Sequence, residues 1–300
     1  MVDLLLATYN GGKFLREQLY SLFSQDFSDF RIIARDDGSD DGTADILEEF
    51  RSQLSDRMKI VRSETEKHSA KDNFAELMKH SDAEYVMLCD QDDFWDSDKI
   101  SVTLDEMKKH PSDIPVLVHT DLAVSDENLN VIAPSMNGMM GFDAENITLE
   151  KLLVYNCVTG CTLMMNKALC DIAKNMPDEA VIHDWWIALC AMTFGKIVYI
   201  DRPTMLYRQH GGNVVGARRK TLKSAFSEGE KLHRSLADGY RQAEALIRNF
   251  RGEIPADKLK IIRGYAIFPK LNKFERAVAL TRFGYTKSSA IKTIGQIIFS

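Results

Sequence analysis

Three carboxylates stand within four residues at Asp90, Asp92 and Asp93, directly after the apolar run 85–89. Adjacent carboxylates repel one another unless a cation neutralises them. Hard oxygen ligands suit Mg²⁺ or Mn²⁺, and these ions usually bind with substrate phosphates completing their coordination shell. The spacing therefore indicates a divalent-metal and phosphate site. A solvated acidic turn before a helix near Asp98 explains the same residues, so the cluster alone leaves both interpretations open.

Two other polar segments also follow apolar runs. Thr8, Tyr9 and Asn10 come after the run 2–7, and Asp37 lies in the Asp-Asp-Gly-Ser segment after the run 30–34. An aspartate at such a position can accept a hydrogen bond from a nucleobase N–H or a ribose hydroxyl. Asp, Gly and Ser are also common in turns and helix caps. These segments indicate either a nucleotide site or ordinary turn chemistry.

A fourth carboxylate, Asp184, lies beside Trp185 and Trp186. A carboxyl group next to apolar rings can have a raised proton affinity, which a general base needs, and flat indoles suit stacking on sugars. The alternative is the start of a core helix with a buried tryptophan. His210 stands in a glycine-flanked loop and could bind a metal or a phosphate, or it could be a surface histidine.

These residues must be positioned by the elements between them, and the first half of the chain alternates strand and helix patterns. Such a series predicts an α/β fold with a mainly parallel sheet and helices on both faces, whose ligands bind beyond the carboxyl ends of the strands. The polar segments lie at those ends. The expected strands are 2–7, 30–34, 58–61, 85–89 and 116–118, and the expected helices are 14–23, 43–50, 73–80 and 99–110.

The second half is less regular. The segment 128–146 is rich in Met, Gly and Asn and predicts loops. Apolar patterns predict a long helix over 222–250 and basic helices after Pro255. We therefore expect a catalytic domain over residues 1–216 and a helical, basic extension over 217–300. The remaining expected elements are helices at 149–155 and 184–194 and strands at 162–165 and 197–200.

The composition is that of a soluble globular protein, with 45% hydrophobic and 27% charged residues among 300. No run of 18 apolar residues predicts a membrane span, and the N-terminus lacks the basic region of a signal peptide. The five cysteines stand in apolar contexts without the partners of a zinc site, so we expect free thiols in a reducing compartment and a cytoplasmic protein.

Charge is distributed unevenly along the chain. Residues 258–300 hold nine Lys or Arg against a single acid, Glu275, whereas the whole chain has a net charge of −6. A basic, partly apolar tail suggests contact with an anionic membrane surface, or packing within the protein or in a homodimer. Nucleic acid is not an expected partner, because no nucleic-acid motif accompanies the tail.

Taken together, the motifs resemble the family 2 glycosyltransferases with the GT-A fold, a Rossmann-like architecture. The resemblance extends over about residues 3–215 and depends on segments that occur in the family's order. These segments are Leu6 to Gly11, Gln25-Asp26-Phe27, Asp36 to Thr43, Asp90-Gln91-Asp92-Asp93, His183-Asp184 and the His210 loop.

The resemblance implies a role for each residue. Asp184 matches the base that deprotonates the acceptor hydroxyl, which implies transfer with inversion at the anomeric carbon. Asp92, Asp93 and His210 match the residues around the D-x-D region that hold Mn²⁺ or Mg²⁺ against the leaving diphosphate. The donor nucleotide would contact Thr8, Tyr9, Asn10, Asp37 and Asp90, and the acceptor or sugar pocket would include Trp185, Trp186, Asn156, Thr159 and Gly160.

Within this family, the residues of these motifs are most similar to those of bacterial rhamnosyltransferases of cell-wall and capsular polysaccharide assembly. This implies dTDP-L-rhamnose as donor and a saccharide acceptor, carried on a polyprenyl lipid at the inner face of the plasma membrane. Alternatives are a UDP-hexose donor or a nucleotide-sugar-binding protein without transfer activity. A nucleotidyltransferase would need a glycine-rich, basic phosphate loop, of which Gly11-Gly12-Lys13 is only a weak version.

Overall fold

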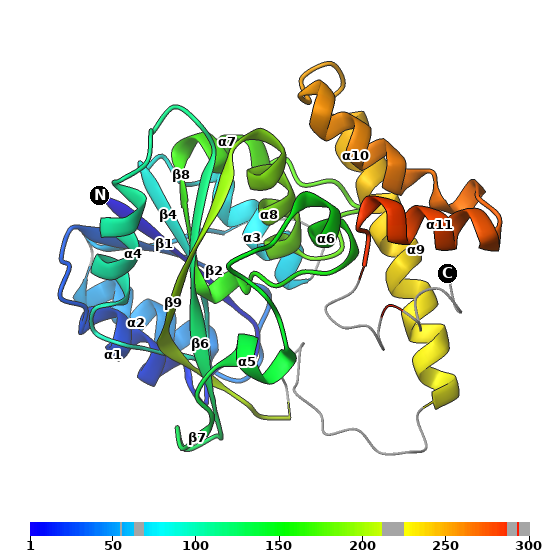
Figure 1. Cartoon of the computed structure of the whole chain (residues 1–300). Helices are drawn as coiled ribbons and strands as arrows, with labels where there is room; N and C mark the ends of the chain where they lie inside the picture. Colours follow the sequence, from blue (N-terminus) through cyan, green and yellow to red (C-terminus); the bar gives the residue numbers. More distant parts are fainter. Residues whose placement is uncertain (55, 63–68, 212–224, 287–292, 294–300) are drawn as a thin grey trace.

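The computed structural model describes residues 1–54, 56–62, 69–211, 225–286 and 293. Among these, nine strands form one sheet in the order β3-β2-β1-β4-β8-β6-β9-β5, and β7 pairs with β6 at the side (Figure 1). The strands are β1 (Val2–Thr8), β2 (Phe30–Asp36), β3 (Met58–Ile60), β4 (Tyr85–Asp90), β5 (Phe94–Trp95), β6 (Val116–Ser125), β7 (Val131–Ala133), β8 (Leu163–Asn166) and β9 (Lys196–Arg208).

The parallel part of the sheet brings the polar segments to one edge. β1 lies between β2 and β4, and Thr8 is in register with Asp36 while Ala7 is in register with Asp90. These strands are mostly apolar because both faces of the sheet are covered. Their carboxyl ends therefore present the first polar residues side by side, as the α/β pattern predicted.

Beyond β4 the sheet is mixed. β8 runs antiparallel to β4 and to β6, whereas β6 and β9 are parallel. Half of the eight strand pairings are antiparallel, so the sheet is less uniformly parallel than a strict strand–helix alternation suggests. The expected α/β architecture with helices on both faces is confirmed, and the antiparallel β8 carries the chain back past the acidic cluster.

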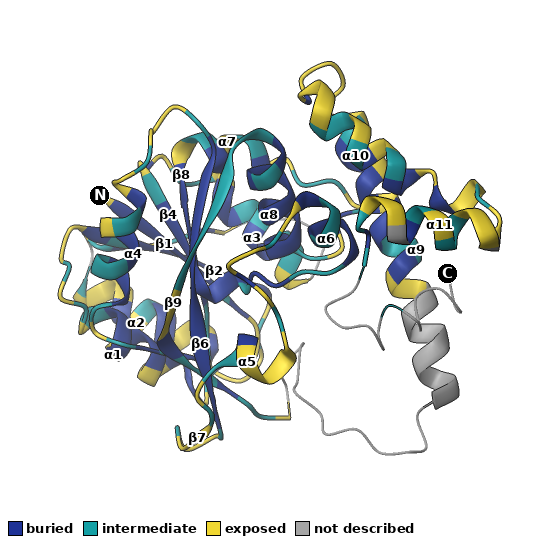
Figure 2. Ribbon diagram, viewed as in Figure 1, coloured by how far each residue is buried: buried dark blue, intermediate teal, exposed yellow. Residues whose placement is uncertain are grey.

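Two apolar cores lie on opposite faces of the sheet. In β1, Leu4 and Leu6 join the core under α1 (Leu15–Phe23), α2 (Thr43–Gln53) and α4 (Lys99–Met107), whereas Leu5 joins the core on the other face. This alternation follows from the two-residue period of a strand. The second core is covered by α3 (Ala70–Lys79), α6 (Leu149–Val154), α7 (Lys167–Ala173) and α8 (His183–Phe194), as the buried central strands in Figure 2 illustrate.

Two segments differ from the sequence-based expectation. The segment 128–146 is not all loop, because it contains β7 and α5 (Met136–Met140). Ser135 caps this short helix by accepting a hydrogen bond from Gly138 N, and Gly141 ends it with φ 68°. β9 covers 13 residues where four were expected, because a register shift near Pro203 lets the strand continue past a polar interruption.

The C-terminal helices share the core of the α/β unit. They are α9 (Ala225–Asn249), α10 (Ala256–Ala266) and α11 (Lys273–Phe283), which confirms the expected helical extension. Tyr240 and Tyr265 belong to the same apolar cluster as Trp186 on α8. The expected boundary between residues 216 and 217 lies outside the described residues, so the division into domains stays a prediction. None of the described helices is long and apolar enough to span a bilayer.

Candidate active site

A cavity of about 900 Å³ lies at the carboxyl ends of the parallel strands. Its wall is formed by the ends of β1, β2 and β4, the first turns of α3 and α8, α5, and the loop 156–160 before the short 3-10 helix η1 (Gly160–Thr162). The predicted site residues in this wall are Thr8, Tyr9, Asp37, Asp90, Asp92, Asn156, Thr159, Gly160 and Asp184. The fold therefore gathers residues that are up to 176 positions apart in the sequence into one cavity.

The end of the cavity near β1 and β2 is polar, and its side chains are joined by hydrogen bonds. Thr8 Oγ1 donates to Asp36 Oδ1 at 2.8 Å, and Asp37 forms a buried ion pair with Arg35 at 3.0 Å. The carboxylate of Asp36 is engaged within its own turn, where it accepts hydrogen bonds from Ser39 N and Ser39 Oγ. Thr8 and Asp37 line the cavity at this end, together with Tyr9 and Gly38.

Gln91 is a residue of the site that the sequence reasoning did not single out. Its Oε1 accepts from Tyr9 N and its Nε2 donates to Tyr9 O, both at 2.8 Å. This reciprocal pair joins the ends of β1 and β4. The sequence could have indicated Gln91 as a site residue, because it lies between Asp90 and Asp92, which were both predicted to stand at the end of the same strand.

Asn10 lies outside the cavity wall. It adopts φ 49°, accepts from Asp40 N at 3.0 Å and donates its own backbone N–H to Ser39 Oγ at 2.8 Å. Positive φ is tolerated by asparagine better than by most residues. Asn10 therefore joins the loops after β1 and β2, and its expected contact with the nucleotide finds no support in the cavity's geometry.

Asp92 and His210 come together although 118 positions separate them, with 2.7 Å between Oδ2 and Nε2. Buried Arg208 supports the pair: its Nε donates to Asp92 O at 2.9 Å, and its guanidinium lies 4.5 Å from the centroid of the Phe14 ring. The Phe14 ring in turn lies 4.9 Å from the His210 ring. A carboxylate and an imidazole are side chains of the kinds that can bind a divalent cation.

Asp93 points away from the cavity into the protein. It is 0% exposed, and neither carboxylate oxygen has a hydrogen-bond partner among the described residues. Burial, and then the charges of Asp92 and Asp90, hold its pKa well above the ordinary value. Buried Lys99 is a charged neighbour, and burial lowers the pKa of its ammonium group to about 8.

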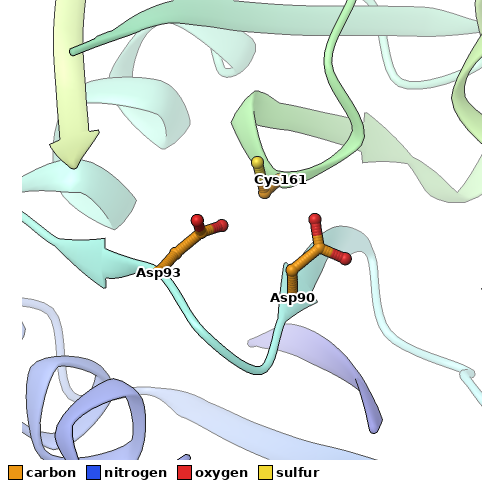
Figure 3. A group of neighbouring side chains, drawn as sticks. All are labelled: Asp90, Asp93 and Cys161. Atoms are coloured by element: carbon orange, nitrogen blue, oxygen red, sulfur yellow. The ribbon is translucent and has the colours of Figure 1, made fainter. Parts of the chain in front are cut away.

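The side chains of Asp90, Asp93 and Cys161 lie close together (Figure 3), with ligand atoms within 4.8 Å of one another. Burial raises the pKa of the Cys161 thiol, which keeps it protonated, and a thiol is a poor ligand for the hard cations Mg²⁺ and Mn²⁺. The oxygen and nitrogen atoms of Asp92 and His210 suit such a cation better, and Asp92 of this pair lines the cavity.

Asp184 lies in the first turn of α8 and reaches the cavity. Its Oδ1 accepts from Trp185 N at 2.6 Å and Asn156 Nδ2 at 3.0 Å, and its Oδ2 accepts from Gly160 N at 3.1 Å. Burial raises the pKa of Asp184 to about 7, although these hydrogen bonds act in the opposite direction. A carboxyl group with this pKa can accept a proton near neutral pH and release it afterwards.

Trp185 and Trp186 do not face the cavity, so the expectation that they stack on a sugar is wrong. Trp185 is buried and donates from Nε1 to Leu152 O at 2.6 Å. Trp186 is 0% exposed and stacks on Phe250 with centroids 6.2 Å apart. Both belong to the core because α8 is buried on nearly every side, which was the structural alternative for this helix.

Comparison with known proteins supplies the chemical context. Residues 3–172 match the family model described as Glycosyl transferase family 2. The chain is 34% identical over 223 residues to dTDP-rhamnosyl transferase RfbG of Shigella flexneri, covering 71% of this chain and 74% of that protein. It is 23% identical over 230 residues to glycosyltransferase GlyG of Streptococcus pneumoniae, covering 72% and 73% respectively.

Two solved structures have a similar fold. TarS 1-349 of S. aureus in complex with UDP-GlcNAc gives a TM-score of 0.58 at 16% identity, covering 95% of this chain and 89% of that chain. The mannosyltransferase PcManGT of Pyrobaculum calidifontis in complex with GDP-Man and Mn²⁺ also gives 0.58 at 16% identity, covering 99% and 79%. At this identity the similarity concerns the fold.

Proposed function

Because the chain belongs to the family 2 glycosyltransferases and shares their GT-A fold, we propose that it transfers a single sugar, L-rhamnose from dTDP-rhamnose, to a saccharide acceptor with inversion. The protein is a glycosyltransferase; donor, stereochemistry and acceptor are the proposal. One observation carries the proposal. The ends of β1 and β4 and the side chain of Asp184 line the same cavity, and burial raises the pKa of Asp184 to about 7.

Asp184 acts as the general base. It takes the proton from the acceptor hydroxyl as that oxygen attacks the anomeric carbon, and the bond from this carbon to the diphosphate oxygen breaks on the opposite side. The displacement inverts the anomeric configuration, because one bond forms as the other breaks. Burial keeps the proton affinity of Asp184 high enough to complete the transfer at neutral pH.

Asp92 and His210 hold Mn²⁺ or Mg²⁺ in this proposal, and Asp93 supports the cluster from inside. When bound, the cation supplies Lewis-acid stabilisation of the leaving diphosphate. The nucleotide lies at the β1–β2 end, where Thr8 and Asp37 line the wall and Tyr9 offers an exposed ring. Asp90, whose pKa burial raises to about 7, contacts the ribose.

Two observations support rhamnose over a hexose that carries a 6-hydroxyl group. The relative from Shigella flexneri bears the name of a dTDP-rhamnosyl transferase. In addition, Met136, Met140 and Phe142 give one side of the cavity an apolar surface, which suits the methyl group of a 6-deoxy sugar better than a hydroxymethyl group. A UDP-hexose donor with the same chemistry is the alternative.

A donor panel tests the proposal. Wild type and Asp184→Asn would be incubated with Mn²⁺ and dTDP-rhamnose, UDP-hexoses or GDP-mannose, and scored for transfer and donor hydrolysis. We expect turnover of dTDP-rhamnose that EDTA abolishes and that Asp184→Asn lacks. Turnover confined to UDP-hexoses would establish the alternative donor. Metal-dependent nucleotide binding without turnover on any acceptor would instead indicate a binding protein.

We further place catalysis in residues 1–216 and membrane contact in residues 217–300, which suits a polyprenyl-linked acceptor at the inner face of the plasma membrane. On the described part of this region, Phe274 is 78% exposed and Val278 and Phe283 are also exposed. Lys270 and Arg282 are exposed nearby in the sequence. Apolar and cationic side chains together bind anionic bilayers. Of the apolar residues in the basic tail, Ile291, Ile294, Ile297 and Ile298 lie outside the described residues.

Vesicle co-sedimentation tests the membrane contact. Phe274→Glu combined with Lys270→Glu is preferable to deleting residues 258–300, because Ile262 and Tyr265 in that segment are buried in the core. We expect binding to vesicles containing phosphatidylglycerol but not to pure phosphatidylcholine, and loss of binding in the double variant. Lys108→Glu on the distant end of α4 is the control for charge. Unchanged binding by the double variant, with a dimer in sedimentation, would favour a homodimer surface.

A further inference from the structure

The loop 156–160 makes contacts that go beyond lining a sugar pocket. The Asn156 side-chain amide donates to Asp184 Oδ1 at 3.0 Å and to Val158 O at 2.7 Å, and its oxygen accepts from Val158 N at 3.0 Å. Both N–H groups and the oxygen of this amide are therefore engaged. Because the two bonds to Val158 fix the plane of the amide, the remaining N–H has one direction available, and it points at Asp184.

Gly160 holds the other carboxylate oxygen from the same loop. Its N–H donates to Asp184 Oδ2 at 3.1 Å. A Cβ atom at this position would lie 2.6 Å from His183 Nε2 and 3.5 Å from Asp184 Cβ, so the close approach of the loop to α8 requires glycine. The loop therefore donates a hydrogen bond to each carboxylate oxygen of Asp184, from the Asn156 side chain to Oδ1 and from the Gly160 backbone to Oδ2.

The two oxygens of Asp184 are not equivalent. Within the described part of the chain, Oδ1 accepts two hydrogen bonds, from Trp185 N and Asn156 Nδ2, whereas Oδ2 accepts one, from Gly160 N. A carboxylate oxygen has two lone pairs to offer. Oδ2 therefore keeps the accepting capacity that a substrate hydroxyl needs, on a residue that lines the cavity.

We propose that Asp184 Oδ2 is the atom that receives the acceptor proton, and that Asn156 is a positioning residue that orients this oxygen toward the cavity. The inference rests on the proposed function, since it assumes that Asp184 is the base. Asn156 touches Asp184 and its own loop, so it acts through Asp184 and is distinct from a sugar-binding residue.

The charged surroundings of Asp184 set the direction of the pH effect. Asp90 at the end of β4 lines the same cavity, and besides burial the charge of Asp184 is one of the causes that raise the pKa of Asp90. His183, adjacent on α8, is buried, and burial lowers the pKa of its ring to about 3, so it is neutral at the pH of the assay. The Asn156 N–H stabilises the carboxylate form, and its removal raises the pKa of Asp184.

The test compares the pH dependence of kcat and the donor KM for wild type, Asn156→Ala and Asn156→Ser, with dTDP-rhamnose, or whichever donor the panel identifies, as substrate. In Asn156→Ala we expect kcat to fall by about 10- to 100-fold because the base is misoriented. The acidic limb of the profile should move up by about one pH unit with the loss of one hydrogen bond to a charged group. The donor KM should stay within about twofold of wild type, since binding energy common to ground and transition states is unaffected.

Asn156→Ser keeps a small donor and should recover part of kcat, and Asn249→Ala at the exposed end of α9 is the matched control. Thermal unfolding checks that each variant is folded. Wild-type kcat and pH profile in folded Asn156→Ala would overturn the inference, as would a raised donor KM at unchanged kcat, which would make Asn156 a sugar-binding residue. If Asp184→Asn itself transfers normally, the proposed function fails first; if it is inactive while Asn156→Ala is normal, only the inference fails.

Discussion

Replacing Asp184 with asparagine should stabilise the folded protein at neutral pH even as it removes sugar transfer. Burial raises the pKa of this carboxyl group from 3.8 to about 7. The unfolded chain loses the proton near pH 4 and the folded chain keeps it until about pH 7, so the stabilisation present below pH 4 is lost as the pH rises through this window. At about 1.4 kcal/mol for each pKa unit, the total loss is about 4 kcal/mol.

Asparagine does not ionise, so the variant does not lose this stability as the pH rises. It does, however, lose one hydrogen bond of the buried site. Its oxygen can replace Oδ1, which accepts from Trp185 N and Asn156 Nδ2, while its NH₂ group then faces the N–H of Gly160. Two donors facing each other in a buried site cost about 2 kcal/mol. The variant should therefore be about 2 kcal/mol more stable than wild type at pH 8, and slightly less stable than wild type at pH 5.

Urea unfolding of wild type and Asp184→Asn between pH 5 and pH 8 measures this difference directly. The difference in unfolding free energy should rise with pH by about 2 to 3 kcal/mol and level off above pH 7. Asp105→Asn, which removes an exposed carboxylate from α4, is the control. A difference that stays constant over this range would refute the reasoning, because it would mean that Asp184 ionises at the same pH in both states.

Three further outcomes follow from the site. The rate of transfer should fall about tenfold for each pH unit below pH 7, because Asp184 becomes protonated; a flat kcat profile between pH 5 and pH 8 would contradict its role as base. Asp92→Asn should lose the Mn²⁺-induced thermal shift while Asp93→Asn retains it, because Asp92 contacts His210 and Asp93 points inward; the reverse order would assign the cation to the interior cluster. Trp186→Ala should lower stability by about 3 to 5 kcal/mol through a core cavity and leave the donor KM of the folded enzyme unchanged; a large rise in KM would restore the sugar-stacking role.

The strand ends of the first half were predictable from the sequence because a fully buried parallel strand is a continuous apolar run. The polar residues that come directly after such a run mark the edge of the sheet. Thr8, Asp37 and Asp90 were found in this way, and the structure places all three in the wall of one cavity. The meeting of Asp92 with His210 needed the family resemblance, since no local pattern relates residues 118 positions apart.

The tryptophans show where sequence reasoning fails. An amphipathic helix reveals its buried face by the spacing of its apolar residues, but α8 is apolar on all sides. Trp185 and Trp186, next to a catalytic candidate, could then be assigned to a pocket as easily as to a core. Asp92 and Asp93 present the same difficulty, because the chain leaves the strand at this point and the two-residue alternation no longer tells which carboxylate faces inward.

The stacking of Trp186 on Phe250 has a consequence for how the chain can be divided. A polypeptide that stopped at residue 216 would keep every cavity residue that we describe, yet it would leave Trp186 and Phe194 of α8 without the Phe250 ring that packs against both. That side of α8, the helix whose first turn contains Asp184, would then be exposed to solvent. The shorter chain should aggregate when expressed, and fusions or partner domains are better joined after the last helix than at the apparent end of the catalytic part.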